Sequence, residues 1–442
     1  MSHTNTDLDG RDAHFIRSVA KLGDCSTLLS TQPIYNSRKV KLVETGARVD
    51  SRLLDRLLAH KLLEPIDRCV NVENAFSAQD FADALTERLE QAPAFAAMLP
   101  AFGTSTALQD LCRRVHIEPQ LAVKLTVARE MNPRLLQRTL DVALVCGYLS
   151  RKIGKSPEDT VCALSAGLFL DIGLLHIDPA ILASQASLTV AQRRHIYSHP
   201  VIAYHILNEY PQYRGAIATA VLQHHERFDG SGYPGGLLGP AISPLGQALM
   251  LADVTGAVLR RSDSEPVRAN VWTAFGLARH KFSPQLIDLV IELAGDHAEH
   301  PHDTNNAPMD PADMQRAFGR ITAVMSDWGA LVESRSITGD AEDPFVNFVR
   351  DRVDALARAL AEAGFDWRNG DEFVRHMGTS PAAGRELNVF AREALWHLRD
   401  LLHEAYREHA RFSQTGAPGG PGSSDVLAWS DRSLAALDDT PV

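Results

Sequence analysis

Two aspartates and three histidines have the types and surroundings needed to hold a metal ion. Asp171 and Asp253 are each flanked by aliphatic residues, where an ionised carboxylate is costly unless it is paired or bound to a cation. His199 and the adjacent His224 and His225 add imidazoles. Taken singly, each residue also fits an ordinary buried or surface position. Together, imidazoles and carboxylates suit Fe, Mn, Zn or Ni, and a metal would offset the desolvation of the aspartates.

The elements that must position these residues are predicted to be helices from about residue 104 to residue 294. Ser156 and Thr189 are typical helix N-caps, since Asp159 and Gln192 follow three residues later and could complete capping boxes. The Gly- and Pro-rich segment 229–244 lies between two helical runs and is predicted to be a structured loop. The fold class is therefore mainly α.

Changes in composition and patterning divide the chain into five parts. They are a poorly patterned segment (1–38), a small α+β module with a hairpin around Gly46 and a helical connector (39–103), the helical domain with the candidate residues (104–298), a C-terminal helical domain (308–412) and a disordered tail rich in Gly, Pro and Ser (413–442).

Composition excludes several classes of protein. Of the 442 residues, 45% are hydrophobic and 22% are charged, as in ordinary globular proteins, and the net charge is −11. The acidic balance argues against a protein that coats nucleic acid or an anionic membrane. The apolar run 161–175 is short and contains Asp171, so no membrane span is expected. Five scattered cysteines and a polar N-terminus favour a cytoplasmic location.

The longest motif runs from His224 to Gly239 and reads HHERFDGSGYPGGLLG. With the downstream Ala-Asp-Val segment around Asp253, it resembles the HD-GYP family of cyclic di-GMP phosphodiesterases, over about residues 108–293. The resemblance implies an HD-type helical bundle that holds two or three metal ions. The predicted fold is thus mainly α: an HD-type bundle with a small α+β N-terminal module and a C-terminal helical bundle.

The resemblance also implies a ligand set for one metal. In the family, the Asp of the HD pair bridges two metals, so Asp171 is the candidate catalytic residue here. One metal would be completed by His199, His224 and His225, giving a site with three imidazoles and one carboxylate. The expected cofactor is one divalent transition metal: Fe, Mn, Zn or Ni.

The second metal is where the sequence departs from the family. The HD histidine is Leu170, the upstream histidine position falls on Arg138, and the lysine expected to contact phosphate is Leu174. Of the family's ligands, only Asp171 and Asp253 remain. One hypothesis places the Arg138 guanidinium between these carboxylates, as a fixed cation. The alternative is an arginine that points to solvent.

Residues of the Gly-rich loop are the candidate nucleotide contacts. Gly232, Tyr233 and Pro234 could present backbone N–H groups and an aromatic ring to a guanine nucleotide or a partner protein. The alternative is a turn-rich loop anchored by its tyrosine. Glu226 could orient one of the tandem histidines or lie at the surface at a helix end.

These observations predict a signalling protein with a degenerate HD-GYP domain. It would keep one metal and hydrolyse cyclic di-GMP or a related small nucleotide weakly, or mainly bind ligands or partner proteins. The alternatives are an active metal-dependent phosphodiesterase and a metal-free scaffold. The resemblance further implies diguanylate-cyclase (GGDEF) proteins as partners.

Overall fold

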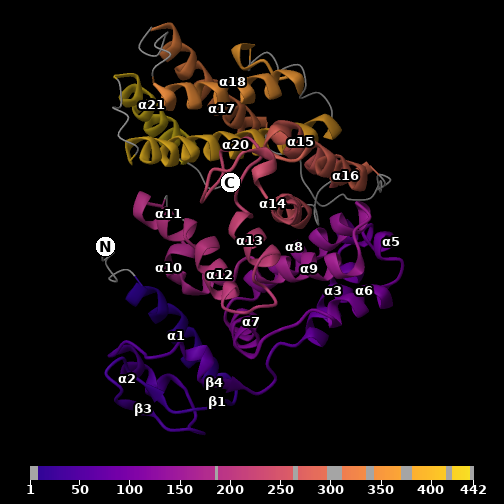
Figure 1. The fold of residues 1–442 in the computed structure, drawn as a ribbon. Coiled ribbons are helices and arrows are strands. Elements are labelled where there is room, and N and C mark those ends of the chain that lie inside the picture. Colours follow the sequence, from indigo (N-terminus) through magenta and orange to yellow (C-terminus); the bar gives the residue numbers. More distant parts are fainter. Residues whose placement is uncertain are drawn as a thin grey trace. The chain divides into compact units, whose positions relative to one another are not determined.

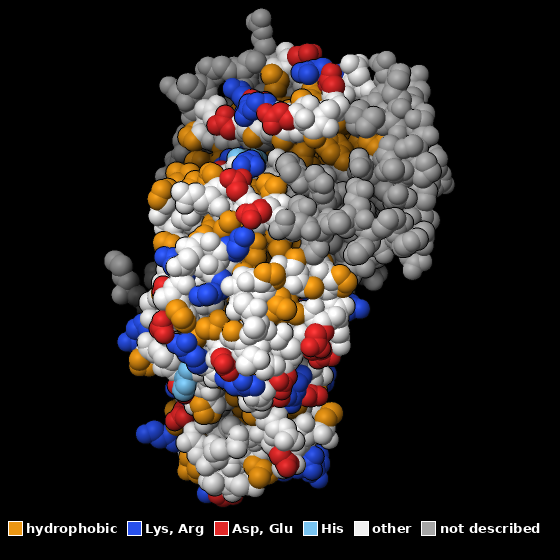
Figure 2. Space-filling model, turned by 90° about the vertical axis from the view of Figure 1, so that its right-hand side faces the viewer, with side chains coloured by type: hydrophobic (Ala, Val, Ile, Leu, Met, Phe, Trp, Pro, Cys, Tyr) orange, Lys and Arg blue, Asp and Glu red, His pale blue; other side chains and the backbone are white. Residues whose placement is uncertain are grey.

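The computed structural model describes residues 8–184, 188–261, 267–295, 311–334, 343–369, 381–414 and 421–438. Figure 1 shows that helices dominate, which confirms the predicted mainly α class. The chain forms two compact units, Met1–Ala257 and Val258–Val442. On the described part of the face in Figure 2, basic and acidic side chains are interspersed.

The N-terminal module combines one long helix with short strands. Its elements are α1 (Leu8–Cys25), β1 (Leu28–Ser30), β2 (Ile34–Tyr35), β3 (Lys41–Val43), η1 (Ser51–Leu53), α2 (Leu54–Leu58), η2 (Ile66–Arg68) and β4 (Val70–Val72). β1 pairs antiparallel with β4, with Leu28 opposite Val72, and β2 pairs with β3, with Ile34 opposite Val43. The predicted α+β module is therefore present. β3 pairs with β2, however, and not across the turn at Gly46.

The module begins earlier than the sequence suggested. The prediction treated residues 1–38 as poorly patterned, but α1 lies within that segment. Its apolar residues Phe15, Val19 and Leu22 recur at helical spacing and are buried in the module's core, together with Val123 and Val127 of the next domain. The polar residues between these apolar positions obscured their helical spacing in the sequence.

Helices α3 to α13 and the larger part of α14 make up the rest of the first unit. They are α3 (Ala78–Gln91), α4 (Pro93–Ala96), α5 (Leu99–Phe102), α6 (Ser105–Arg113), α7 (Pro119–Met131), α8 (Pro133–Lys152), α9 (Pro157–Phe169), η3 (Ile172–His176), α10 (Pro179–Leu182), α11 (Val190–Tyr197), α12 (His199–Asn208), α13 (Ala216–Gln223), η4 (Gly239–Ala241) and α14 (Pro244–Arg261). Thr189 and Gln192 form the predicted capping box, whereas Ser156 makes only the N-cap half of its own.

The centre of this bundle is the close pair α8 and α9. A Cβ at Gly167 of α9 would lie 2.3 Å from the Ala143 Cα on α8, so only glycine permits this approach. Within the described residues, Pro157–His176 is long and apolar enough to cross a membrane, with a mean hydropathy of 1.3, but 78% of that window is buried inside the protein. This segment therefore lies in the core of the helical bundle.

The second unit is a helical bundle. It contains α15 (Val267–Ala278), η6 (Arg279–Lys281), α16 (Pro284–Gly295), α17 (Pro311–Glu333), α18 (Pro344–Glu362), η7 (Trp367–Asn369), α20 (Pro381–Gln414) and α21 (Pro421–Asp438). The predicted boundary between residues 298 and 308 lies outside the described residues. The compact unit begins earlier, at Val258, because α15 packs on α20, where the His397 ring lies 3.3 Å from the Ala274 carbonyl oxygen. This boundary falls inside the predicted HD-GYP domain of residues 104–298, whose limits stay a prediction.

The predicted disordered tail, residues 413–442, is wrong for its larger part. Residues 421–438 form α21, whose Val426, Trp429 and Leu437 are fully buried in the bundle core. Trp429 Nε1 donates a hydrogen bond to the Val324 carbonyl oxygen at 3.3 Å. The Gly- and Pro-rich composition before α21 obscured this apolar spacing. Residues 415–420 and 439–442 lie outside the described ranges.

The packing of α21 gives a direct test. We expect Trp429→Ala to lower the free energy of unfolding of the second unit by about 3–5 kcal/mol, because it removes a fully buried indole. Trp396→Ala is the matched control, since Trp396 is 40% exposed and should lose much less. Urea unfolding of the full chain measures both. Equal, small effects would mean that α21 does not pack in this core.

Candidate metal centre

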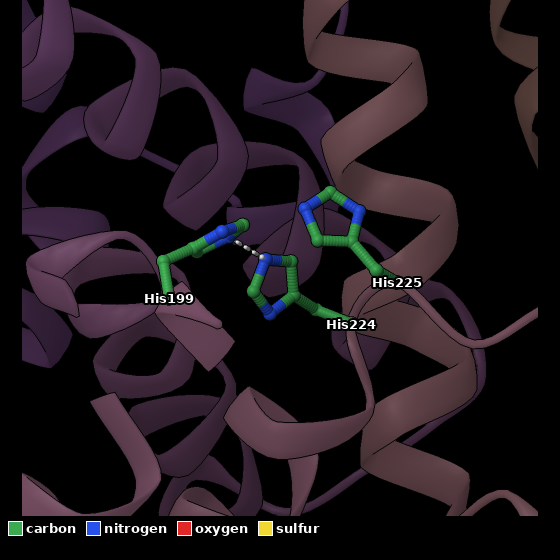
Figure 3. Close-up of side chains that lie close together, drawn as sticks. All are labelled: His199, His224 and His225. Carbon is green, nitrogen blue, oxygen red and sulfur yellow. Dashed lines mark hydrogen bonds between the residues drawn. The ribbon is translucent and has the colours of Figure 1, made fainter. Parts of the chain in front are cut away.

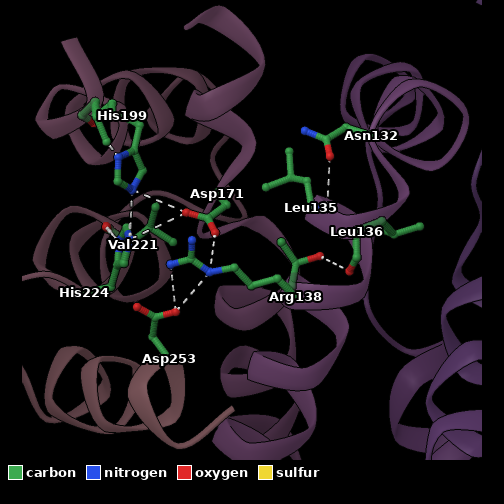
Figure 4. A network of polar contacts seen from close by, with 11 residues as sticks. Asn132, Leu135, Leu136, Arg138, Asp171, His199, Val221, His224 and Asp253 are labelled. Atoms are coloured by element: carbon green, nitrogen blue, oxygen red, sulfur yellow. Dashed lines mark hydrogen bonds and ion pairs between the residues drawn. The ribbon is translucent and has the colours of Figure 1, made fainter. Parts of the chain in front are cut away.

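Side chains from five separate elements converge in the first unit. Asp171 lies between α9 and η3, His199 begins α12, and His224 follows α13. Arg138 comes from α8 and Asp253 from α14. Figure 4 shows these side chains pointing toward one another. All the residues predicted as metal ligands therefore belong to one neighbourhood.

Glycine at position 173 makes the meeting of Asp171 and His199 possible. A Cβ at Gly173 would lie 2.1 Å from the His199 carbonyl oxygen, far inside van der Waals contact. Any larger residue would push the start of α12 away from η3. The close approach places the His199 Nε2 3.3 Å from the Asp171 Oδ1.

The three predicted histidines form a cluster. One nitrogen of each of His199, His224 and His225 lies within 4.8 Å of the others. Figure 3 shows the three rings grouped together. The Nδ1 atoms of His199 and His224 each lie 2.6 Å from a backbone carbonyl oxygen, of Ile196 and Val221. A carbonyl can only accept, so both Nδ1 atoms carry hydrogen and both Nε2 atoms of the neutral rings present a lone pair.

Those two lone pairs face each other. The Nε2 atoms of His199 and His224 are 3.2 Å apart. Two acceptors at this distance repel unless a proton or a metal ion is shared between them. Backbone carbonyls that fix the Nδ1–H tautomer are also what orients histidine ligands in metal sites. The geometry thus fits a cation.

Burial keeps the tandem histidines neutral. It lowers the pKa of His224 to about 4, with a further contribution from His199. Burial also lowers the pKa of His225 well below its ordinary value. At neutral pH both rings are therefore uncharged, which is the form that binds metals.

The two oxygens of Asp171 have different neighbours. The carboxylate is fully buried, and its Oδ1 lies 3.3 Å from His199 Nε2 and 3.9 Å from His224 Nε2. Neither oxygen accepts a hydrogen bond of good geometry. A buried oxygen beside two imidazole lone pairs lacks positive charge on that side. With three nitrogens and one carboxylate oxygen, the donor set fits one transition metal ion.

Arg138 supplies positive charge on the other side. Its Nε lies 3.1 Å from Asp171 Oδ2, and its Nη2 lies 2.9 Å from Asp253 Oδ1. This confirms the hypothesis that the guanidinium lies between the carboxylates, and the alternative of an arginine pointing to solvent is wrong. Asp253, predicted as a metal ligand, pairs with Arg138, and its role as a ligand stays a prediction.

The charges of Arg138 and Asp171 stabilise each other. Burial raises the pKa of Asp171, but the Arg138 guanidinium, together with contributions from His199 and His224, outweighs it and holds that pKa below its ordinary value. Burial likewise lowers the pKa of Arg138, but the two carboxylates outweigh it and raise that pKa above its ordinary value. Asp171 and Arg138 are therefore both ionised at neutral pH.

A family model described as "HD domain" matches residues 122–269. Residues 122–269 therefore carry an HD domain. Among its relatives are the cyclic di-GMP phosphodiesterase response regulator RpfG of Xanthomonas campestris pv. campestris (35% identical over 119 residues; 26% of this chain, 31% of the relative) and the 3'3'-cGAMP-specific phosphodiesterase 1 of Vibrio cholerae (25% over 189 residues; 40% and 43%). The match therefore spans less than half of each relative's length.

Two leucines give the HD domain an apolar wall beside Asp171. Leu170 and Leu174, which the sequence analysis placed at the histidine and lysine positions of the HD-GYP pattern, are both buried. Neither can donate a lone pair or neutralise a phosphate. The polar contacts of Asp171 come instead from α8, α12 and the end of α13.

Glu226 anchors the Gly-rich loop of the HD domain. Both predicted roles, orienting a histidine and lying at the surface, are wrong. The side chain is 1% exposed, and its carboxylate accepts hydrogen bonds from the backbone N–H groups of Gly235 (2.6 Å) and Leu237 (2.9 Å). Gly232 allows the loop to fold back, because a Cβ there would lie 2.3 Å from the Glu226 Cα.

Tyr233 lies against the histidine cluster. Its ring stacks on His225 with centroids 4.8 Å apart, and its backbone N–H donates to the His225 carbonyl oxygen at 3.0 Å. On its other side lies Tyr197, with ring centroids 4.6 Å apart. The sequence analysis missed Tyr197, although its place two residues before His199 was a usable signal. The loop thus adds aromatic surface next to the candidate metal site, with Gly232 and Pro234 on either side of Tyr233.

The close packing at Gly173 predicts that a larger residue at this position weakens metal binding. Gly173→Ala should weaken the affinity for Mn²⁺ at least about tenfold, because the new methyl group separates His199 from Asp171. Gly276→Ala is the control, since a Cβ at Gly276 meets no atom within 4 Å. Calorimetric titration with Mn²⁺ measures both. Unchanged affinity in Gly173→Ala would contradict the proposed role of His199 and Asp171.

Proposed function

We propose that this HD domain binds a cyclic dinucleotide, such as cyclic di-GMP or 3'3'-cGAMP, at a centre with a single metal ion and hydrolyses it slowly. The relatives, named as phosphodiesterases for these two nucleotides, support the class of substrate. The cluster of His199, His224, His225 and Asp171 supports the metal. When bound, such an ion would supply a water of lowered pKa for attack on a phosphodiester.

One observation carries the single-metal proposal: the Arg138 guanidinium lies between Asp171 and Asp253. The second family metal would need these same two carboxylates. A guanidinium attached to α8 neutralises them but has no open coordination position for water. Arg138 therefore holds Asp171 ionised and oriented toward the histidines, without providing a second nucleophile.

A reduced rate follows from this substitution. Loss of an ion that positions hydroxide or stabilises developing charge raises the barrier by several kcal/mol, which corresponds to orders of magnitude in rate. Leu174 also leaves an apolar side chain where the family is expected to contact phosphate with a lysine. Binding should thus be retained better than turnover.

A diguanylate-cyclase (GGDEF) protein in the cytoplasm is the partner that we propose. The Gly-rich loop supports a protein contact, because Leu238 is 64% exposed beside residues held rigidly by Glu226. An exposed aliphatic side chain on a fixed loop is typical of interaction surfaces.

Metal stoichiometry tests the single-metal centre. The purified protein loaded with Mn²⁺ should hold about one equivalent, and the double variant Leu170→His/Arg138→His should hold about two, because it supplies two new imidazoles beside Asp171. Leu170→His/Arg134→His is the matched control, since Arg134 is exposed on the same helix. Two equivalents in the wild-type protein, or none, would contradict the proposal.

Turnover tests the enzymatic part. With Mn²⁺ present, we expect slow conversion of cyclic di-GMP or 3'3'-cGAMP to the linear dinucleotide, abolished in Asp171→Ala. The variant Leu170→His/Arg138→His should be at least about tenfold faster. Chromatography of the products measures both, with Arg134→Ala as control. Nucleotide binding with no hydrolysis would contradict the enzymatic part, and no nucleotide binding would contradict the proposal as a whole.

A further inference from the structure

A pocket of about 690 Å³ lies within the first unit, between the N-terminal module and the helices of the HD domain. Apolar side chains from α1, α2 and α12 form much of its wall, among them Phe15, Leu58, Ile202 and Ile206. Its volume falls in the range of sites for small organic molecules and far exceeds the space of one water. The metal ligands do not line it.

A buried lysine lies at the polar end of this pocket. Lys124 is 3% exposed, and its Nζ lies 3.1 Å from Asp67 Oδ2 and 3.1 Å from His176 Nε2. The same ammonium lies 3.8 Å from the centre of the Phe15 ring. The ammonium is thus engaged by an anion, an acceptor and an aromatic face. It has little left with which to attract an anionic ligand.

Asp67 provides a buried carboxylate oxygen that lacks a hydrogen-bond donor. Its side chain is only 7% exposed, and the residue lines the pocket. Oδ2 contacts Lys124, but Oδ1 is buried without a hydrogen-bond partner. A buried carboxylate oxygen is strongly stabilised by a donor and is seldom left without one. The molecule that fills the pocket should therefore bring an N–H or O–H group.

Charge balance indicates that this molecule is neutral. Lys124 already compensates Asp67, and at the rim Arg68 forms an ion pair with Glu209. A cationic ligand at Asp67 Oδ1 would lie beside the Lys124 ammonium and be repelled. An anion would meet the negative oxygen.

We propose that this pocket binds a small uncharged organic molecule with an apolar body and one N–H or O–H group that donates to Asp67 Oδ1. The apolar body would lie among the aliphatic side chains of α2 and α12. This site is separate from the proposed nucleotide site and does not depend on the metal. It uses residues from both the N-terminal module and the HD domain, so the module has a ligand-binding role.

Two probes test the proposal, and they differ only in that a methyl group replaces the N–H hydrogen in one of them. Indole is uncharged, flat and carries one N–H donor, whereas 1-methylindole has no donor. On the full chain, indole should bind at least about fivefold more tightly than 1-methylindole, the difference expected for one hydrogen bond to a buried acceptor. Saturation-transfer NMR titrations measure both affinities.

A variant that fills the pocket localises the binding. Ile206→Trp should weaken indole binding at least about fivefold, because the larger side chain occupies the cavity. Tyr204→Trp, on the same helix but not lining the pocket, should bind indole like the wild type. Melting temperatures show whether both variants fold. Equal affinity for the two probes, no indole binding, or unchanged binding in a folded Ile206→Trp variant would each overturn the proposal.

Discussion

The Asp171 carboxylate is fully buried and ionised, so positive charge must reach it from within the protein. Each oxygen meets this need differently. Oδ2 has the Arg138 guanidinium, while Oδ1 faces the Nε2 lone pairs of His199 and His224. The position of Arg138, the tautomers of the histidines and the fit of one cation all follow from this division.

The elements around Asp171 are held in place by contacts of groups that are not themselves candidate metal ligands. Gly173 lets η3 approach the start of α12, and carbonyl oxygens of Ile196 and Val221 fix the imidazoles. Both η3 and α12 continue to the pocket of the N-terminal module, where η3 ends at His176 and α12 contributes Ile206. Both elements therefore connect the candidate metal centre with the pocket.

The sequence-based predictions succeeded where the chemistry of a residue restricts the surroundings in which it can be buried. Aspartate among aliphatic residues, together with a long motif, predicted the cluster, and the same reasoning anticipated Arg138. It failed where the partner was unknown: Glu226 finds its donors nine and eleven residues later, inside the loop. It also failed where composition outweighed periodicity, as in α1 and α21, whose apolar stripes are flanked by polar or Gly- and Pro-rich residues.

The charge of the centre sets a limit on its chemistry. Asp171 and Asp253 together carry two negative charges, of which Arg138 cancels one. A single divalent ion at the histidines would then leave one net positive charge, whereas two divalent ions beside the same carboxylates and no arginine would leave two. A cyclic dinucleotide carries two negative phosphates, and the transition state for hydrolysis gathers further negative charge on one of them. Under the proposal of one metal ion, a centre with half the positive charge would bind the ground state but stabilise that transition state less, so the fixed guanidinium would favour binding over turnover.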